Sequence, residues 1–332
     1  MRKYTIALLG CGQMGAEHLH FIYYRENVYI KYVCDTDIEK ARLLQRKVAA
    51  GYAVCDADIC ISDEEVDIVI IATYPETHTA LLKKCVSHGK HVLCEKPIAN
   101  TLEEAKSFYE IAAAHPECKV LVGHILRHNL TYNKVAELIQ SGTIGGPLVM
   151  RMVQNHHTMN WERYRALICQ TSPIIDCGVH YFDIMQWMSG EKIVGVSGIS
   201  QKLASDLPDG KYDYGMVTLR FSGGSIGYYE AGWTNTSSSE NTKEFIGPKG
   251  RIKIVYAENR FTNREEGDLI EIYRFPERSY EIMNINCKRK PTDLQFDHLI
   301  RMIEENAPAK PTLEEALSCC EWTFRADKAI CQ

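Results

Sequence analysis

Short apolar runs and longer amphipathic stretches alternate through the first 124 residues. The apolar runs predict buried strands at 4–9, 29–34, 66–72, 91–96 and 119–124. The stretches between them have helical spacing and predict helices that end near residue 24 or span about 37–50, 76–88 and 101–114. Apolar strands that alternate with helices of about 10 to 15 residues are typical of a parallel sheet covered on both faces. We therefore expect an α/β domain over residues 1–124.

The pattern changes after residue 124. A helix is expected at about 130–140, and strands that alternate between apolar and polar residues, with turns between them, follow from 193 to about 284. Such half-buried strands indicate an antiparallel sheet. Two helices, at about 293–306 and 313–330, close the chain. The second domain is expected to be α+β and to span residues 125–332, with both terminal helices in it.

One segment of the second domain is apolar but carries three polar side chains in register. It reads SPIIDCGVHYFDIMQWM, residues 172–188, and includes Asp176, His180 and Asp183. Offsets of four and then three residues place these side chains on one stripe of a helix. They have the chemistry of metal ligands, of an acid/base relay, or of a capped helix start that holds a buried histidine.

The composition of the 332 residues narrows the class of protein. The length favours about two domains, and the formal net charge of −5 gives no electrostatic reason to expect a nucleic acid or an acidic membrane as partner. No apolar run approaches the roughly 20 residues that cross a bilayer, and the N-terminus is read as a first strand rather than a signal peptide. The thirteen cysteines include no CxxC pair, so reduced thiols in the cytoplasm are expected instead of disulfides or a zinc site.

A glycine-rich turn follows the first strand. It reads Gly10-Cys11-Gly12-Gln13-Met14-Gly15, and this GxGxxG spacing lets the backbone approach a pyrophosphate at a helix N-terminus. Asp35 ends the second strand, 20 residues past the last glycine, where a carboxylate can bind ribose hydroxyls. Because a carboxylate repels a 2′-phosphate, NAD is expected rather than NADP. The predicted NAD-binding residues here are Gly10, Gly12, Gln13, Met14, Gly15 and Asp35.

Three segments together resemble a known family. They are the glycine turn, residues 72–99 (ATYPETHTALLKKCVSHGKHVLCEKPIA) and residues 176–183 (DCGVHYFD), and the PTLEEAL opening of the last helix extends the likeness along the chain. The sequence is similar to the glucose-fructose oxidoreductase / inositol dehydrogenase / MocA family. The resemblance implies a Rossmann domain followed by an open, mostly antiparallel sheet domain, whose sheet face makes contacts in a homodimer or homotetramer. It also implies an active site in the cleft where the nicotinamide meets the second domain.

The resemblance assigns roles to particular positions. It makes Lys96 a contact of the substrate hydroxyl and the nicotinamide, His180 the proton acceptor and Asp176 its partner toward the substrate. It places five further residues on the loops that contact the cofactor: Thr73, Tyr74, Pro75, His78 and Glu95. This chain has Thr171-Ser172-Pro173 where many members have a glycine-rich run, so the pocket wall there is expected to be reshaped.

The chemistry of these residues fits the implied reaction. Hydride leaves a carbinol carbon as its hydroxyl proton is lost, and histidine suits the role of base near neutral pH. A lysine beside the same oxygen stabilises the developing alkoxide. Alternatives remain: Asp176 as an N-terminal helix cap, and a metal site formed by Asp176, His180 and Asp183, which a neighbouring lysine disfavours, so no metal is expected. Asp183 is expected to have a supporting role, and the Lys96–Pro97 bond is expected to be cis.

Several polar and aromatic residues are weaker candidates for substrate contacts. They lie in segment 155–165 (NHHTMNWERYR) or just after the last strand of the first domain, and they suit a sugar pocket, an interface or a core equally well: His124, Arg127, His156, His157, Asn160, Trp161 and Arg165.

Three functions are compatible with the sequence. The leading one is an NAD-dependent dehydrogenase that acts on a secondary hydroxyl of a sugar, cyclitol or glycoside. The second is an enzyme that keeps NAD bound and uses transient oxidation for elimination or epimerisation. The third is a non-catalytic regulator that senses NAD(H), and the presence of Lys96, Asp176 and His180 argues against it.

Overall fold

The computed structural model describes residues 2–256 and 267–330. The chain forms two compact units, and each is discontinuous in sequence. The first consists of Met1–His128 and Pro291–Cys320, and the second of Asn129–Lys290 and Glu321–Gln332. No helix in the described part of the chain is long and apolar enough to cross a membrane.

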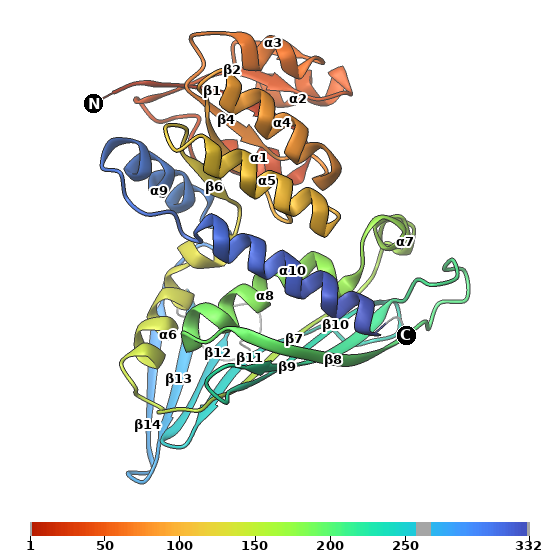
Figure 1. The fold of residues 1–332 in the computed structure, drawn as a ribbon, viewed down its shortest axis with the longest axis vertical. Coiled ribbons are helices and arrows are strands. Elements are labelled where there is room, and N and C mark those ends of the chain that lie inside the picture. The colour runs from red at the N-terminus through yellow and green to blue at the C-terminus, as the bar shows by residue number, and fades with distance from the viewer. Residues whose placement is uncertain (1, 257–266, 331–332) are drawn as a thin grey trace. The chain divides into compact units, whose positions relative to one another are not determined.

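The first unit is built on a six-stranded parallel sheet (Figure 1). Its strands are β1 (Tyr4–Leu9), β2 (Val28–Cys34), β3 (Tyr52–Val54), β4 (Ile68–Ile71), β5 (His91–Cys94) and β6 (Val120–Val122). The strand order β3-β2-β1-β4-β5-β6 is that of a doubly wound dinucleotide-binding sheet, and every neighbouring pair is parallel. The predicted α/β class is confirmed.

Helices connect these strands. They are α1 (Gln13–His20), α2 (Ile38–Val48), α3 (Ala57–Ser62), α4 (Pro75–Ser87), α5 (Leu102–Ala114) and a 3₁₀ turn, η1 (Ile125–His128). Side-chain caps define several starts: Asp37 accepts a hydrogen bond from the Glu39 N–H, and Thr101 accepts one from the Glu104 N–H. The short pair β3 and α3 was not predicted from the sequence.

The first terminal helix, α9 (Thr292–Glu304), belongs to the first unit. Its residues Phe296, Leu299 and Met302 are buried in the same hydrophobic core as β1 and β2. The second terminal helix, α10 (Leu313–Ile330), contributes its first turns to the first unit and the rest to the second. The expected division after residue 124, with both terminal helices in the second domain, therefore differs from the compact units. The reason is that an amphipathic pattern does not reveal which sheet a helix covers.

The second unit contains an eight-stranded sheet in the order β14-β13-β12-β11-β7-β10-β9-β8. Its strands are β7 (Val149–His157), β8 (Ile193–Gln201), β9 (Tyr214–Phe221), β10 (Ile226–Thr234), β11 (Glu240–Gly247), β12 (Gly250–Val255), β13 (Asp268–Arg274) and β14 (Ser279–Ile285). All neighbouring pairs are antiparallel except β7 with β10, which confirms the expected mostly antiparallel sheet. Residues 257–266, within the region of expected strands, lie outside the described residues.

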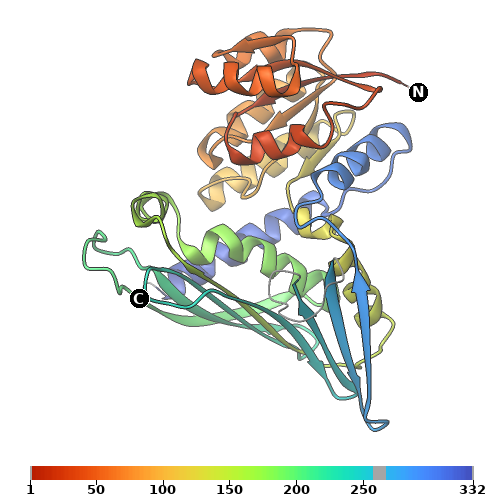
Figure 2. The ribbon, with the colours of Figure 1, turned by 180° about the vertical axis from the view of Figure 1, so that it is seen from behind.

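Helices cover one face of this sheet (Figures 1 and 2). They include α6 (Leu130–Gln140) and α8 (Pro173–Ser189), and α8 packs on β10, β9 and β7. Along β10, Tyr229 and Ala231 are buried beneath the helices, whereas Tyr228 and Glu230 point to the opposite face. No element in residues 2–256 and 267–330 of this unit covers that opposite face, which we call the open sheet face.

Candidate functional site

The glycine turn after β1 has the geometry of a phosphate-binding loop. Gly10 has φ +97°, and a Cβ there would lie 2.4 Å from the Ala72 carbonyl oxygen, so only glycine fits. A Cβ on Gly15 would lie 1.9 Å from the Gly10 oxygen. Because glycine has no Cβ, α1 can start close to the strand. At Gly12 a Cβ would meet no described heavy atom within 4 Å, so the backbone borders open space where α1 begins. Gln13 and Met14 are the first two residues of α1. An anionic ligand at this place would meet the backbone N–H groups of the first helical turn.

Asp35 is held against this turn. Its Oδ2 accepts a hydrogen bond from the Cys11 N–H at 2.8 Å, and its Oδ1 accepts one from the Asp37 N–H at 2.9 Å. The carboxylate therefore lies at the end of β2 beside the start of α1, as a ribose-binding residue would. The glycine turn and Asp35 together fit a dinucleotide.

The loops after β4 and β5 are joined by His78. This residue is buried in α4, and its two ring nitrogens each lie 3.1 Å from a backbone carbonyl oxygen, of Thr73 and of Pro97. Burial lowers the pKa of His78 below its usual value. Tyr74 is exposed and Pro75 starts α4. His78 thus lies between the backbones of two loops that carry expected cofactor contacts, and as a neutral imidazole it donates to one of the two carbonyls.

Glu95 and Lys96 lie at the end of β5. Glu95 Oε1 is 2.7 Å from His18 Nε2, and Glu95 Oε2 accepts a hydrogen bond from the Lys96 N–H at 3.2 Å. Burial alone would raise the pKa of Glu95, but the hydrogen bond and charge of His18 and the charge of Lys96 bring that pKa below its usual value. The Lys96–Pro97 peptide bond is cis, as predicted. His18 was missed in the sequence, where the only signal was a histidine three residues after Gly15.

His124 and Arg127 are both buried within the first unit. The Arg127 guanidinium nitrogen Nη2 lies 3.2 Å from Glu315 Oε1 at the start of α10. This ion pair connects Arg127 of η1 to the first turn of α10. A substrate contact by either residue stays a prediction.

Helix α8 carries the three polar residues of the apolar segment. Ser172 is its N-cap and accepts a hydrogen bond from the Ile175 N–H at 3.1 Å, so the alternative that Asp176 caps this helix is wrong. Asp176 and His180 are partly exposed one turn apart, whereas Asp183 is 2% exposed. The expected stripe on one helix is confirmed. Because Asp183 is buried, a supporting role fits it better than substrate contact.

A buried lysine lies on the sheet among the residues that α8 covers. Lys243 of β11 is fully buried, and its Nζ donates to the Val153 carbonyl at 2.8 Å and to Asn241 Oδ1 at 2.7 Å. The ammonium also lies 4.2 Å from the centre of the Tyr181 ring. Desolvation lowers the pKa of Lys243 to about 7. The sequence did not indicate this residue, because a lysine in a strand is normally exposed.

The residues of segment 155–165 organise α7 (Trp161–Gln170), a helix that was not predicted from the sequence. Asn160 caps it through the Arg163 N–H at 3.1 Å. Trp161 Nε1 donates to Asp206 Oδ2 at 3.0 Å, and Arg165 Nε lies 3.2 Å from the same oxygen.

The two histidines of this segment also have contacts within the second unit. His157 Nδ1 lies 2.9 Å from the Ser237 carbonyl oxygen, and the ring of His156 lies near that of Tyr164. The segment therefore joins α7 to two loops, and roles for His156, His157, Asn160, Trp161 and Arg165 in substrate binding stay predictions.

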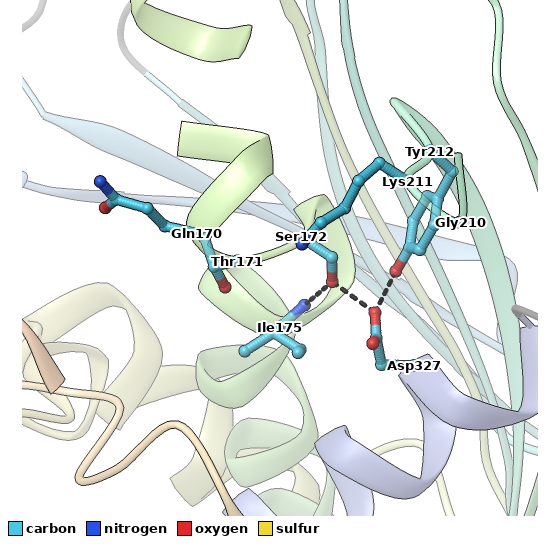
Figure 3. Close-up of a pocket in the computed structure, with 8 residues that line it drawn as sticks. All are labelled: Gln170, Thr171, Ser172, Ile175, Gly210, Lys211, Tyr212 and Asp327. Carbon is cyan, nitrogen blue, oxygen red and sulfur yellow. Dashed lines mark hydrogen bonds between the residues drawn. The ribbon is translucent and has the colours of Figure 1, made fainter. Parts of the chain in front are cut away.

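A small cavity of about 100 Å³ opens where α7 ends and α8 begins (Figure 3). Residues 170–172, Ile175, residues 210–212 and Asp327 line it, and all belong to the second unit. Asp327 Oδ1 accepts hydrogen bonds from the Ser172 hydroxyl, at 2.5 Å, and from the Tyr212 hydroxyl. The Thr171-Ser172 stretch, where the sequence departs from the resembled family, thus borders a cavity.

Among the described residues, no three His, Cys, Asp or Glu side chains form a group that could hold a metal ion. Asp176, His180 and Asp183 share a stripe of α8 but do not form such a group.

Comparison with known proteins gives consistent matches along most of the chain. The model of the oxidoreductase family with an NAD-binding Rossmann fold matches residues 4–124, and that of the GFO/IDH/MocA C-terminal domain matches residues 132–253. Inositol 2-dehydrogenase 2 of Mycolicibacterium vanbaalenii is 31% identical over 260 residues, which cover 76% of this chain and 73% of that protein. Myo-inositol 2-dehydrogenase of Thermotoga maritima is 25% identical and covers 74% of each chain. The crystal structure of myo-inositol 2-dehydrogenase from Lactobacillus plantarum has the same fold, with a TM-score of 0.83, 16% identity and coverage of 99% of this chain and 97% of that one.

Proposed function

Because this chain belongs to the GFO/IDH/MocA family of oxidoreductases with an NAD-binding Rossmann fold, we propose that it oxidises a secondary hydroxyl of a sugar, cyclitol or glycoside to a ketone. The observation that carries this proposal is the stripe on α8. It presents a carboxylate and an imidazole one turn apart, both partly exposed, in a helix that is otherwise mostly buried. The inositol dehydrogenases among its relatives support a ring that carries several hydroxyl groups as the part of the substrate that is oxidised.

In this reaction His180 accepts the proton of the substrate hydroxyl as the carbon–hydrogen bond breaks. Asp176 binds the same region of the substrate or orients the imidazole. Lys96 lies at the carboxyl end of β5, the edge of a doubly wound sheet where ligands bind, and its ammonium stabilises the negative charge that develops on the oxygen. The bound dinucleotide supplies the hydride acceptor. In the reverse direction His180 returns the proton.

We assign NAD rather than NADP as the preferred dinucleotide. The support is the position of Asp35, whose carboxylate is fixed by the N–H groups of Cys11 and Asp37 at the end of β2. An anion fixed there disfavours a 2′-phosphate, because the two charges would repel each other.

The test is NADH absorbance at 340 nm with a panel of inositols, sugars and glycosides. Steady NADH formation with at least one compound supports the dehydrogenase. Conversion of a compound without net NADH would point instead to transient oxidation with bound NAD. Tight NAD binding without conversion of any compound would overturn the enzymatic proposal and favour a regulator.

We further propose that two copies of the chain associate through the open sheet face. This face carries exposed apolar side chains, and two of them, Val149 and Ile226, are direct neighbours on paired strands. Exposed contiguous apolar surface is typical of interaction sites. Light scattering after size-exclusion chromatography should show an oligomer, and Ile226→Lys should dissociate it. Leu43→Lys, at an exposed position of α2, is the control and should leave the oligomer intact. A monomeric wild-type protein would contradict this proposal.

A further inference from the structure

The cavity at the start of α8 lies next to the proposed proton-handling residues along the helix. Ser172 and Ile175 line it, and Asp176 and His180 follow at offsets of four residues on the same stripe. Because a helix rises 1.5 Å per residue, Ser172 lies only about 6 Å before Asp176 along the helix axis. A ligand that contacts Asp176 needs to extend only about one helical turn toward the helix N-terminus to come level with the cavity.

One wall of the cavity presents a fixed hydrogen-bond acceptor. Asp327 is held by the hydroxyls of Ser172 and Tyr212, which are only 6% and 5% exposed and both bind Oδ1. The other carboxylate oxygen, Oδ2, has no hydrogen-bond partner in residues 2–256 and 267–330. The carboxylate is therefore oriented by the protein and has one oxygen available to a ligand.

The other walls present donors. Lys211, Gln170 and Thr171 line the cavity, and within the described part of the chain their side chains have no hydrogen-bond or ion-pair partner. Figure 3 shows the Lys211 side chain extending across the cavity toward Ser172. An ammonium group and a carboxylate thus share one small cavity without pairing with each other.

The loop that supplies Lys211 is held in place. Asp213 is fully buried, and its carboxylate accepts hydrogen bonds from the Leu203 N–H at 2.8 Å and the Ala204 N–H at 2.9 Å. Lys211 itself follows Gly210, whose φ of +75° favours glycine, and its N–H donates to the Pro208 carbonyl at 3.2 Å. A loop that is ordered before binding loses less entropy when a ligand arrives.

We propose that this cavity is a subsite for a hydroxyl-bearing substituent on the ring that is oxidised, so that the preferred substrate is a glycoside rather than a free cyclitol or monosaccharide. The proposal rests on the proposed dehydrogenase function. Neutral hydroxyl groups both donate and accept, which matches a cavity lined by one available carboxylate oxygen and an ammonium group, whereas a phosphate would be repelled by Asp327. The volume of about 100 Å³ is well below the roughly 300–1,000 Å³ of pockets that enclose a whole ligand, so the cavity holds one part of a larger substrate.

The test compares pairs of compounds that share the oxidised ring, namely inositols and monosaccharides with their glucosides. The wild-type protein should have a higher kcat/KM for the glucoside of at least one pair. The quantity compared is kcat/KM for the glucoside divided by kcat/KM for the free ring compound. Lys211→Met should lower this ratio about tenfold, because a charged hydrogen bond to the glucoside is lost. Asp327→Asn should also lower it. Lys192→Met, at an exposed lysine of the same unit, is the matched control and should leave the ratio unchanged.

Two outcomes would overturn the subsite. One is a wild-type preference for the free ring in every pair, and the other is an unchanged ratio in Lys211→Met. Saturation-transfer NMR with the same glucosides separates this proposal from the dehydrogenase itself. If the wild-type protein binds a glucoside and Lys211→Met weakens that binding, the subsite is supported even if no compound is oxidised. If the wild-type protein binds no glucoside, the subsite is overturned.

Discussion

His18 of the first helix and Glu95 at the end of β5 form a buried pair, with imidazole Nε2 2.7 Å from carboxylate Oε1. They are 2% and 6% exposed. Glu95 uses its second oxygen to accept the N–H of Lys96, so the pair connects the helix after the glycine turn to the lysine proposed for catalysis. We expect His18 to act as a positioning residue for Lys96.

His18→Ala should therefore affect both stability and turnover. It leaves the Glu95 carboxylate buried without its partner, which should lower the free energy of unfolding by about 3–5 kcal/mol. It should also lower kcat more than it raises KM, because the Lys96 backbone loses its fixed anchor. His18→Gln keeps a donor and should recover most of both losses. Urea unfolding and steady-state kinetics measure the two effects, and normal kcat in a folded His18→Ala protein would rule out positioning.

Lys96→Ala and His180→Ala should each lower kcat/KM by at least about 10². The physical reason is loss of charge stabilisation in the first variant and of the proton acceptor in the second. NAD affinity, followed by fluorescence titration, should change little in either. Lys106→Ala, an exposed lysine of α5, serves as control. Near-normal turnover in either variant would remove the role assigned to that residue.

Two substitutions of Asp35 separate its charge from its hydrogen bonds. Asp35→Asn keeps an acceptor for the Cys11 N–H but removes the negative charge, so the preference for NAD over NADP should fall about tenfold. Asp35→Ala removes the acceptor as well and should weaken binding of both dinucleotides. Dissociation constants for the two dinucleotides measure this difference. An unaltered preference in Asp35→Asn would mean that another residue selects the dinucleotide.

Lys243 should make stability depend on pH. Burial lowers its pKa to about 7 in the folded protein, from its ordinary value of 10.5, so between these values the unfolded chain binds more protons than the folded one. The contribution of Lys243 to the unfolding free energy should therefore become more favourable as pH rises from about 7 to 10.5. Lys243→Met should be more stable than the wild type at pH 6.5, by about 1 kcal/mol or more.

This difference should shrink as the pH increases toward 9.5. Urea unfolding at several pH values provides the measurement. A difference that stays constant with pH would show that Lys243 does not titrate in this range.

Elements with an apolar run or with regular alternation of apolar and polar residues were predictable from sequence, whereas strands that lack both patterns were not. Strand β3 has three residues and an exposed Tyr52, so it lacks the apolar run that identified its neighbours. Strand β11 has Lys243 at a fully buried position, which breaks the alternation that a strand is expected to show. In both cases contacts with the rest of the sheet determine the strand, and these contacts are remote in sequence.

The candidate site was predictable to a similar extent. Spacing alone placed Asp176 and His180 on one stripe and Asp35 near the glycine turn, because helix period and strand order determine both relations. The partnership of His18 with Glu95 joins positions 77 residues apart, and no local pattern reports it. The alternative that Asp176 caps the helix was considered, whereas Ser172, which is the actual cap, was not. A capping side chain must precede the first helical residue, and Pro173 occupies that first position.

The chain passes between the two compact units three times, after residues 128, 290 and 320. In terms of gene architecture, the segment 129–290 is an insertion within the dinucleotide-binding unit, whose core is completed only when α9 returns to it. A fragment that stops at residue 128 would lack Phe296 and Leu299 and expose the apolar surface that they cover. A chimaera with new specificity therefore has to exchange 129–290 together with the last turns of α10 as one cassette with three junctions.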